Sequence, residues 1–227
     1  MRKRLLPAML VAPVLVAILG FSGLVAAGGP AASSAATTMP AAGIHFNAKK
    51  LAFHDAMRAL WEIHGTFTER AIVDFVGGLP DTPNVIRHLQ RNQVNIGNAI
   101  KPFYGNKAGD ELTSLLHQHI TDAVNCVVAA KAGDQAKLKA AEKAFFANGN
   151  QIARFLHAAN PRFWSLPAMK TMMRIHLNQV LALAVDQIKG HYTANIRLYG
   201  VYIHHLLFGM ADMLSNGIME QFPGKFH

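Results

Sequence analysis

Apolar residues between Asn47 and Phe222 recur at intervals of three and four positions, and no stretch of this segment alternates regularly between apolar and polar residues. The observed spacing places apolar side chains along one stripe of an α-helix, whereas alternation is typical of a half-buried β-strand. A segment of about 175 residues has the usual size of a single domain. We therefore predict one all-α domain, an antiparallel bundle of four to five helices with one extra short helix.

Turn and capping residues divide this segment into helices. Gly77-Gly78-Leu79-Pro80 ends the first helix, and Asp81 or Thr82 with Pro83 begins a short one that ends near Ile100, before Lys101-Pro102. In Ala132-Gly133-Asp134, the glycine suits a helix end and the aspartate the next N-cap. The predicted helices span residues 48–77, 82–100, 106–131, 134–158, 166–189 and 191–221.

The N-terminus has the pattern of a secretory signal peptide. Arg2, Lys3 and Arg4 precede an apolar run from Leu5 to Ala27 that ends in small residues. We predict a signal peptide over 1–27, a flexible linker over 28–47 that is rich in Ala, Ser and Thr, and the helical bundle domain over 48–222. The protein is then exported to the periplasm, the cell envelope or the medium. It contacts a membrane only if the signal segment stays uncleaved as an anchor.

Charge and cysteine content exclude several classes of function. Removal of residues 1–27 leaves 19 basic and 13 acidic residues, a formal charge of +6, and the basic residues are scattered rather than clustered. This distribution argues against nucleic-acid binding and suits an acidic envelope polymer, a lipid headgroup or a partner protein. With Cys126 as the single cysteine, the chain has no internal disulfide, no attachment motif for c-type haem and no cysteine zinc site.

Four histidines fall near the midpoints of four predicted helices. Each belongs to an apolar stripe, so each is predicted to point into the bundle. Antiparallel packing of these helices brings their midpoints to one depth. The four are His64, His119, His176 and His205.

Several imidazoles in one dry layer cannot all be protonated, and a neutral imidazole is a good ligand for iron, copper or zinc. We predict a mononuclear metal site with iron or copper as first choices and zinc as a third. Asp122 and Asp212 are possible further ligands, because each follows a histidine on the same face. Gln179 and Asn148 are candidates for orienting the ligands through hydrogen bonds.

Three other interpretations remain open. The histidines can form a hydrogen-bonded core network without metal, and the chain is then a cofactor-free interaction module of the cell envelope. A b-type haem held without covalent attachment is a second alternative. In the third, the bound metal is Cu(I), because Met169, Met172 and Met173 share a stripe with His176. Methionine is, however, also a common residue of hydrophobic cores. No residue pattern identifies a substrate, so whether the protein is an enzyme stays open.

Five segments carry a resemblance to known proteins: Leu60-Trp61-Glu62-Ile63-His64, Arg91-Asn92-Gln93, the segment from Ile96 to Gly105, Ala130-Lys131-Ala132-Gly133-Asp134 and Gln221-Phe222-Pro223. They resemble segments of a bacterial family of small exported helical proteins of unestablished function. Some members carry the label acetylglutamate kinase or glycosyltransferase, but both activities belong mainly to α/β folds, and this chain has no predicted strands. The resemblance includes histidines that match His64, His119 and His176. The resemblance covers about residues 51–223.

Overall fold

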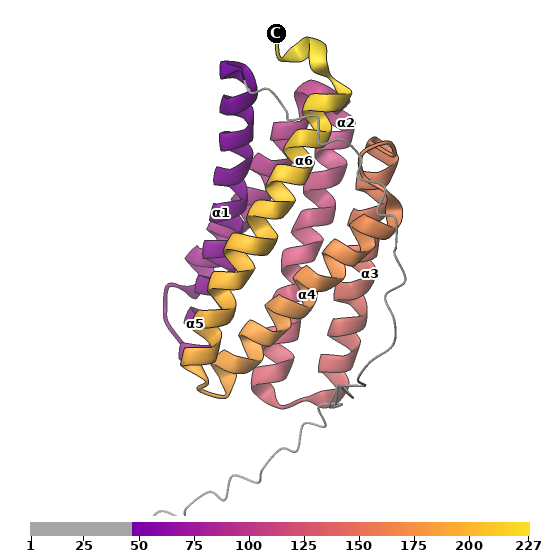
Figure 1. The fold of residues 1–227 in the computed structure, drawn as a ribbon. Coiled ribbons are helices and arrows are strands. Elements are labelled where there is room, and N and C mark those ends of the chain that lie inside the picture. The colour runs from indigo at the N-terminus through magenta and orange to yellow at the C-terminus, as the bar shows by residue number, and fades with distance from the viewer. Residues whose placement is uncertain (1–46) are drawn as a thin grey trace, which may run out of the picture. The chain divides into compact units, whose positions relative to one another are not determined.

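The computed structural model of the protein describes residues 47–227, and this part of the chain is all-α with no strand (Figure 1). The predicted all-α class is therefore confirmed. The predicted signal peptide and nearly all of the predicted linker lie outside the described residues. Within the described part, no helix is long and apolar enough to span a membrane.

The observed helices begin and end within a few residues of the predicted positions. One difference is that the two predicted helices over 82–100 and 106–131 form a single element, α2. The elements are α1 (Ala48–Gly77), α2 (Thr82–Ala132), α3 (Gln135–Ala159), α4 (Leu166–Ile188), α5 (Tyr192–Val201), the π-helix η1 (Tyr202–Leu207), α6 (Phe208–Gln221) and the short 3-10 helix η2 (Pro223–Lys225).

Local signals account for these boundaries. The side chains of Asn47 and Asp134 each accept a 3.0 Å hydrogen bond from the backbone N–H three residues later, which caps α1 and α3 at their N-termini. Gly78 and Gly133 adopt left-handed backbone angles, with φ of 71° and 69°, at the C-terminal ends of α1 and α2. These caps are short-range features, so a single sequence suffices to predict them.

The element α2 folds back on itself at Gly105, where φ is 83° and ψ is 169°. The predicted stop at Lys101-Pro102 is therefore a few residues early. The two halves run antiparallel, as shown by the Gln90 side chain donating to the carbonyl of His117 at 3.4 Å and the His117 ring lying 3.0 Å from the carbonyl of Gln90. Helical segments joined by a tight turn form a hairpin.

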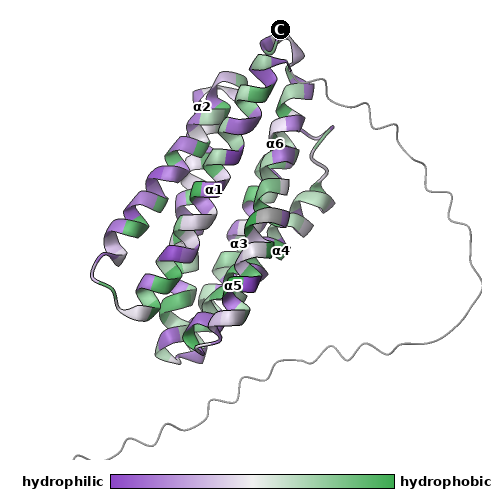
Figure 2. Cartoon of the chain, turned by 60° about the vertical axis from the view of Figure 1, so that its left-hand side comes forward, coloured by the Kyte–Doolittle hydropathy of each residue, from purple (hydrophilic) through white to green (hydrophobic). Residues whose placement is uncertain are grey.

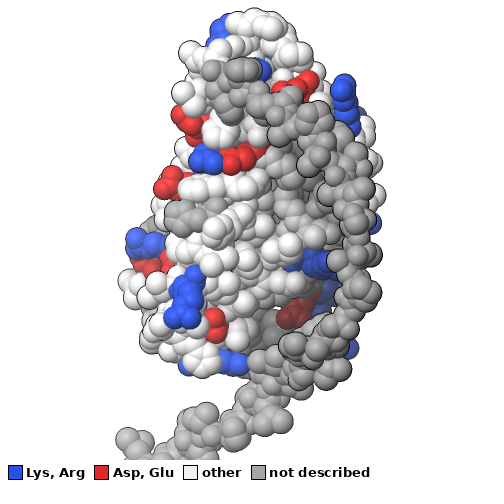
Figure 3. Space-filling view, in the orientation of Figure 1, with Lys and Arg blue, Asp and Glu red and all other residues white. Residues whose placement is uncertain are grey.

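All helices carry both hydrophilic and hydrophobic residues (Figure 2), and the hydrophobic ones form one core that extends through the bundle. Lys, Arg, Asp and Glu are interspersed on the face shown in Figure 3, without a dense basic patch. The most deeply buried side chains come from α3, α4, η1 and α6, and their contacts hold these helices together. They include Phe145, Met169, Leu183, Tyr202, Leu207 and Ala211.

Candidate functional site

Three of the four predicted histidines meet in the core. His64 of α1, His119 of the second half of α2 and His176 of α4 are 6%, 3% and 2% exposed. Their ring centroids lie 5.4 Å apart for His119 and His176, 5.8 Å for His64 and His176, and 6.5 Å for His64 and His119. Together these three residues form the histidine layer. The prediction that they share one depth is confirmed.

Asn148 of α3 orients His119. The side-chain oxygen of Asn148 lies 3.1 Å from Nδ1 of His119, and its amide nitrogen donates to the carbonyl of Leu115 at 3.0 Å. Because an amide oxygen only accepts hydrogen bonds, Nδ1 of His119 carries the proton and Nε2 keeps its lone pair. The orienting role predicted for Asn148 thus agrees with its observed contacts.

The lone pair of His119 meets His176. The two Nε2 atoms are 3.2 Å apart, and the rings are nearly parallel with an interplanar angle of 21°. In the protein alone, Nε2–H of His176 donates to Nε2 of His119. Nδ1 of His176 is then a buried acceptor, and it has no hydrogen-bond partner among residues 47–227.

Gln93 contacts the histidine layer, and the histidine pattern does not reveal it. It is fully buried, and its amide nitrogen lies 3.3 Å from Nδ1 of His64 while donating to the carbonyl of Leu89 at 2.8 Å. The amide therefore donates to Nδ1 of His64, which makes this nitrogen an acceptor. The usable signal in the sequence is a polar residue inside the apolar stripe of Leu89, Ile96 and Ile100.

Burial keeps the histidine layer uncharged. Desolvation, and then the neighbouring His119, lower the pKa of His64 to about 3. Desolvation also lowers the pKa of His119 to about 4, although the bond to Asn148 acts in the opposite direction, and it holds the pKa of His176 well below its usual range. All three imidazoles are consequently neutral at physiological pH, which is the form that binds metals.

His205 does not join the histidine layer. Its side chain is exposed, so the predicted inward orientation is wrong. The reason is the π-helix η1, whose wider turns rotate the helix face relative to a regular α-helix. The fully buried Tyr202 faces the layer instead, with its ring stacked on His176 at 5.7 Å and 13°.

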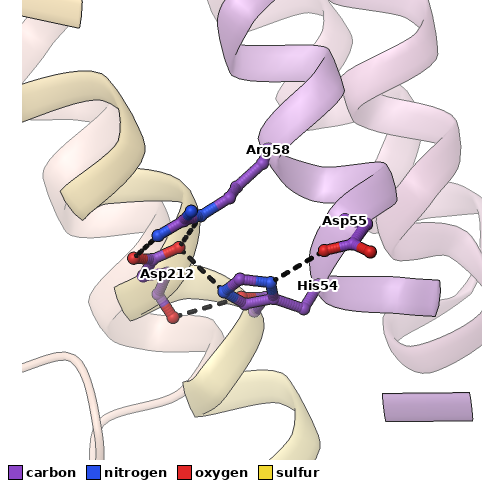
Figure 4. Close-up of polar contacts among 5 residues, drawn as sticks. His54, Asp55, Arg58 and Asp212 are labelled. Atoms are coloured by element: carbon purple, nitrogen blue, oxygen red, sulfur yellow. Dashed lines mark hydrogen bonds and ion pairs between the residues drawn. The ribbon is translucent and has the colours of Figure 1, made fainter. Parts of the chain in front are cut away.

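Asp212 does not reach the histidine layer either. It lies at the partly exposed contact between α1 and α6, where both its oxygens accept 2.6 Å hydrogen bonds from Arg58 (Figure 4). The ring of His54 adds a 2.9 Å contact, and Arg58 lowers the pKa of the carboxyl group. A carboxylate held by these partners has a structural role.

The two remaining predicted residues are Asp122 and Gln179. Each lies close to a layer histidine in sequence, but neither is hydrogen-bonded to one among the described residues. Asp122 is buried and accepts a 2.8 Å hydrogen bond from Gln118. Gln179 is half-buried, and its side-chain oxygen has no hydrogen-bond partner in the described part of the chain. Within residues 47–227, no group of three or more His, Cys, Asp or Glu side chains has the arrangement of a metal site.

Cys126 is buried, as its place on an apolar stripe indicates. Burial raises the pKa of its thiol to about 12. A thiol that stays protonated is a poor nucleophile.

A cavity of about 60 Å³ adjoins the histidine layer. Its walls are almost entirely apolar, and the side chain of Met173 is among those that line it. Pockets for drug-sized ligands measure about 300–1,000 Å³, so this packing has no room for a porphyrin. We call it the first cavity; its lining includes all three histidines with Trp61, Gln93, Ile96, Leu112, Leu116, Trp164 and Met173.

Comparison of the chain with protein-family models, with curated proteins and with solved structures gives no match.

Proposed function

We propose that the protein binds a transition metal ion, iron or copper in the first place and zinc in the second, between the Nε2 atoms of His119 and His176. The observation that carries the proposal is their 3.2 Å separation. Two imidazole nitrogens on one metal at 2.0–2.1 Å, with an angle between 90° and tetrahedral, are about 2.9–3.4 Å apart. Because the two rings meet end to end, with centroids 5.4 Å apart, each ring must also tilt so that both lone pairs point to the ion.

The contacts around the pair support this assignment. A metal-bound histidine usually donates its other ring N–H to an oxygen, as His119 does to Asn148. The neutral state of the rings removes the competition from protons. Two protein nitrogens also leave coordination positions open for a solvent molecule or an exogenous ligand, which redox and oxygen chemistry require.

His64 and Met173 are the candidates for a third protein ligand. His64 becomes available when its ring turns and gives up the long hydrogen bond from Gln93. Met173 lines the first cavity one turn before His176, and its thioether favours Cu(I). The metal is acquired outside the cytoplasm if residues 1–27 act as the predicted signal peptide, cleaved or not.

A separate groove favours a second candidate function, a cofactor-free interaction module of the cell envelope. Lys170 and Arg174 of α4 lie one turn apart and line a polar groove of about 310 Å³ between α3 and α4. Two cations beside such a groove suit an acidic polymer, headgroup or protein.

Elemental analysis of mature protein purified without chelators tests the metal proposal. We expect close to one iron or copper per chain in the wild type and in His205→Ala, whose side chain is exposed. His119→Ala and His176→Ala lose the metal while keeping the circular dichroism of a helical protein. Wild-type protein that is metal-free, and takes up no iron, copper or zinc on titration, contradicts the proposal and favours the envelope module.

A further inference from the structure

Two apolar cavities lie on opposite sides of the histidine layer. The first cavity contains the residues three positions before each layer histidine, namely Trp61, Leu116 and Met173. A second cavity of about 40 Å³ contains the residues four positions after them, namely Thr68, Ala123 and Val180. Because α1, the second half of α2 and α4 all run in one direction (Figure 1), these two sets flank the layer.

The antiparallel first half of α2 confirms this order. Leu89 lines the second cavity, Gln93 lies at the level of the histidine layer, and Ile96 lines the first cavity. The histidine layer thus separates two spaces along the bundle axis. A small molecule in the first cavity lies beside the imidazoles, because all three histidines line it, whereas the second cavity is lined by residues one turn further along the helices.

The second cavity suits an apolar occupant better than water, whereas the mostly apolar first cavity is also lined by Gln93 and His176, each of which has a buried acceptor without a hydrogen-bond partner in the described residues. A buried water needs two to four polar partners, whereas the walls of the second cavity are apolar except for Thr68, whose hydroxyl already donates to the carbonyl of His64 at 2.7 Å. An engineered apolar cavity of about 150 Å³ stays dry and binds benzene or xenon. Volumes of about 60 and 40 Å³ restrict the occupant to one atom or a diatomic molecule.

We propose that the protein binds small uncharged apolar molecules, of the size and class of dioxygen, in the two cavities that flank the histidine layer. Affinity comes from dispersion contacts with the apolar walls. This inference goes beyond metal binding and holds for the metal-free protein, because no wall depends on the ion. A molecule in the first cavity reaches the open face of the His119 and His176 pair when a metal is present.

Xenon is the probe for the first test. Crystals of the metal-free mature protein under xenon pressure are expected to contain one xenon atom in each cavity. Leu116→Phe removes the first xenon and Ala123→Leu the second, because each adds side-chain volume to a wall. The matched controls Leu115→Phe and Ala130→Leu, on the same helix but outside both linings, keep both atoms.

Xenon absent from both cavities, or retained in both filling variants, overturns the proposal. Dioxygen provides a second measurement on the unmodified protein, which does not depend on a variant that folds. Because dioxygen is paramagnetic, it should broaden the methyl NMR signals of Leu112 and Val127, which line the cavities, more than that of Leu183, which is fully buried elsewhere. Equal broadening contradicts the proposal, while the metal content of the protein is unaffected by either result.

Discussion

At the scale of single residues, the properties of the site depend on which ring nitrogen carries the proton. Asn148 places the proton of His119 on Nδ1 and leaves Nε2 free, and Gln93 donates to Nδ1 of His64. Nδ1 of His176 is buried and has no hydrogen-bond partner in the described residues. The layer is therefore one oriented pair, His119 and His176, with His64 in a different hydrogen-bonding state.

Replacing Asn148 with leucine tests the orienting role. We expect the variant Asn148→Leu to keep the helical fold and to bind the metal about 10–100-fold more weakly, the usual effect of removing a partner of a ligating histidine. Competition with a chromophoric chelator measures the affinity. The control Asn150→Leu changes an exposed asparagine of the same helix. Equal affinities in both variants would show that Asn148 does not orient a ligand.

Stability should fall in mild acid because the layer histidines are neutral in the folded protein. Burial lowers the pKa of His64 to about 3 and that of His119 to about 4, while in the unfolded chain they take up protons below about pH 6.5. The unfolded state then binds more protons, so the free energy of unfolding decreases as the pH falls from 6.5 towards 4. Each histidine contributes about 1.4 kcal/mol per pH unit.

Urea unfolding of metal-free wild type and His64→Leu between pH 7 and 4 measures this contribution. Acidic groups such as Asp212 affect both proteins equally, so the difference between the two isolates His64. The pH slope of the variant should be smaller by about 1.4 kcal/mol per pH unit. Identical slopes would mean that His64 becomes protonated in the folded protein.

At the scale of elements, the hairpin within α2 depends on two glycines at the crossing of its halves. A Cβ atom at Gly97 would overlap with the hydroxyl of Thr113 and lie 2.5 Å from the carbonyl oxygen of Gly109. Since a backbone carbonyl cannot rotate away as a side chain can, Gly97→Ala forces the two halves apart. We expect a loss of about 1–3 kcal/mol in the free energy of unfolding.

Gly209→Ala is the matched control, because a Cβ atom at this helical position meets nothing within 4 Å. Alanine should stabilise the helix there by about 0.5–1 kcal/mol. Urea denaturation compares both variants with the wild type. If the two substitutions have the same effect, the close approach of the α2 halves is wrong.

The sequence predicts the helix boundaries well but not the face of the C-terminal helix. Caps such as Asn47, Asp134 and Gly133 act over three or four residues, so they can be recognised without the fold. The π-helix η1 contains neither proline nor glycine, and nothing in Tyr202–Leu207 marks it locally. A regular α-helix over these residues places His205 inside the bundle, whereas the π-helix leaves its side chain exposed.

At the scale of the whole molecule, the common depth of three histidines follows from topology. Helices of similar length joined by short links align their midpoints, so His64, His119 and His176 could be predicted to meet. The 3.2 Å contact between two rings and the hydrogen bond from Gln93 depend on how four helices pack against one another. Side-chain packing of this kind has no signature in a single sequence.

An anomalous difference map from crystals of the metal-loaded protein, recorded above and below the absorption edge of the bound metal, locates the ion. We expect one strong peak bonded to Nε2 of His119 and Nε2 of His176, next to the first cavity. A map with no peak between these atoms, or with peaks only at exposed histidines such as His205, would contradict it.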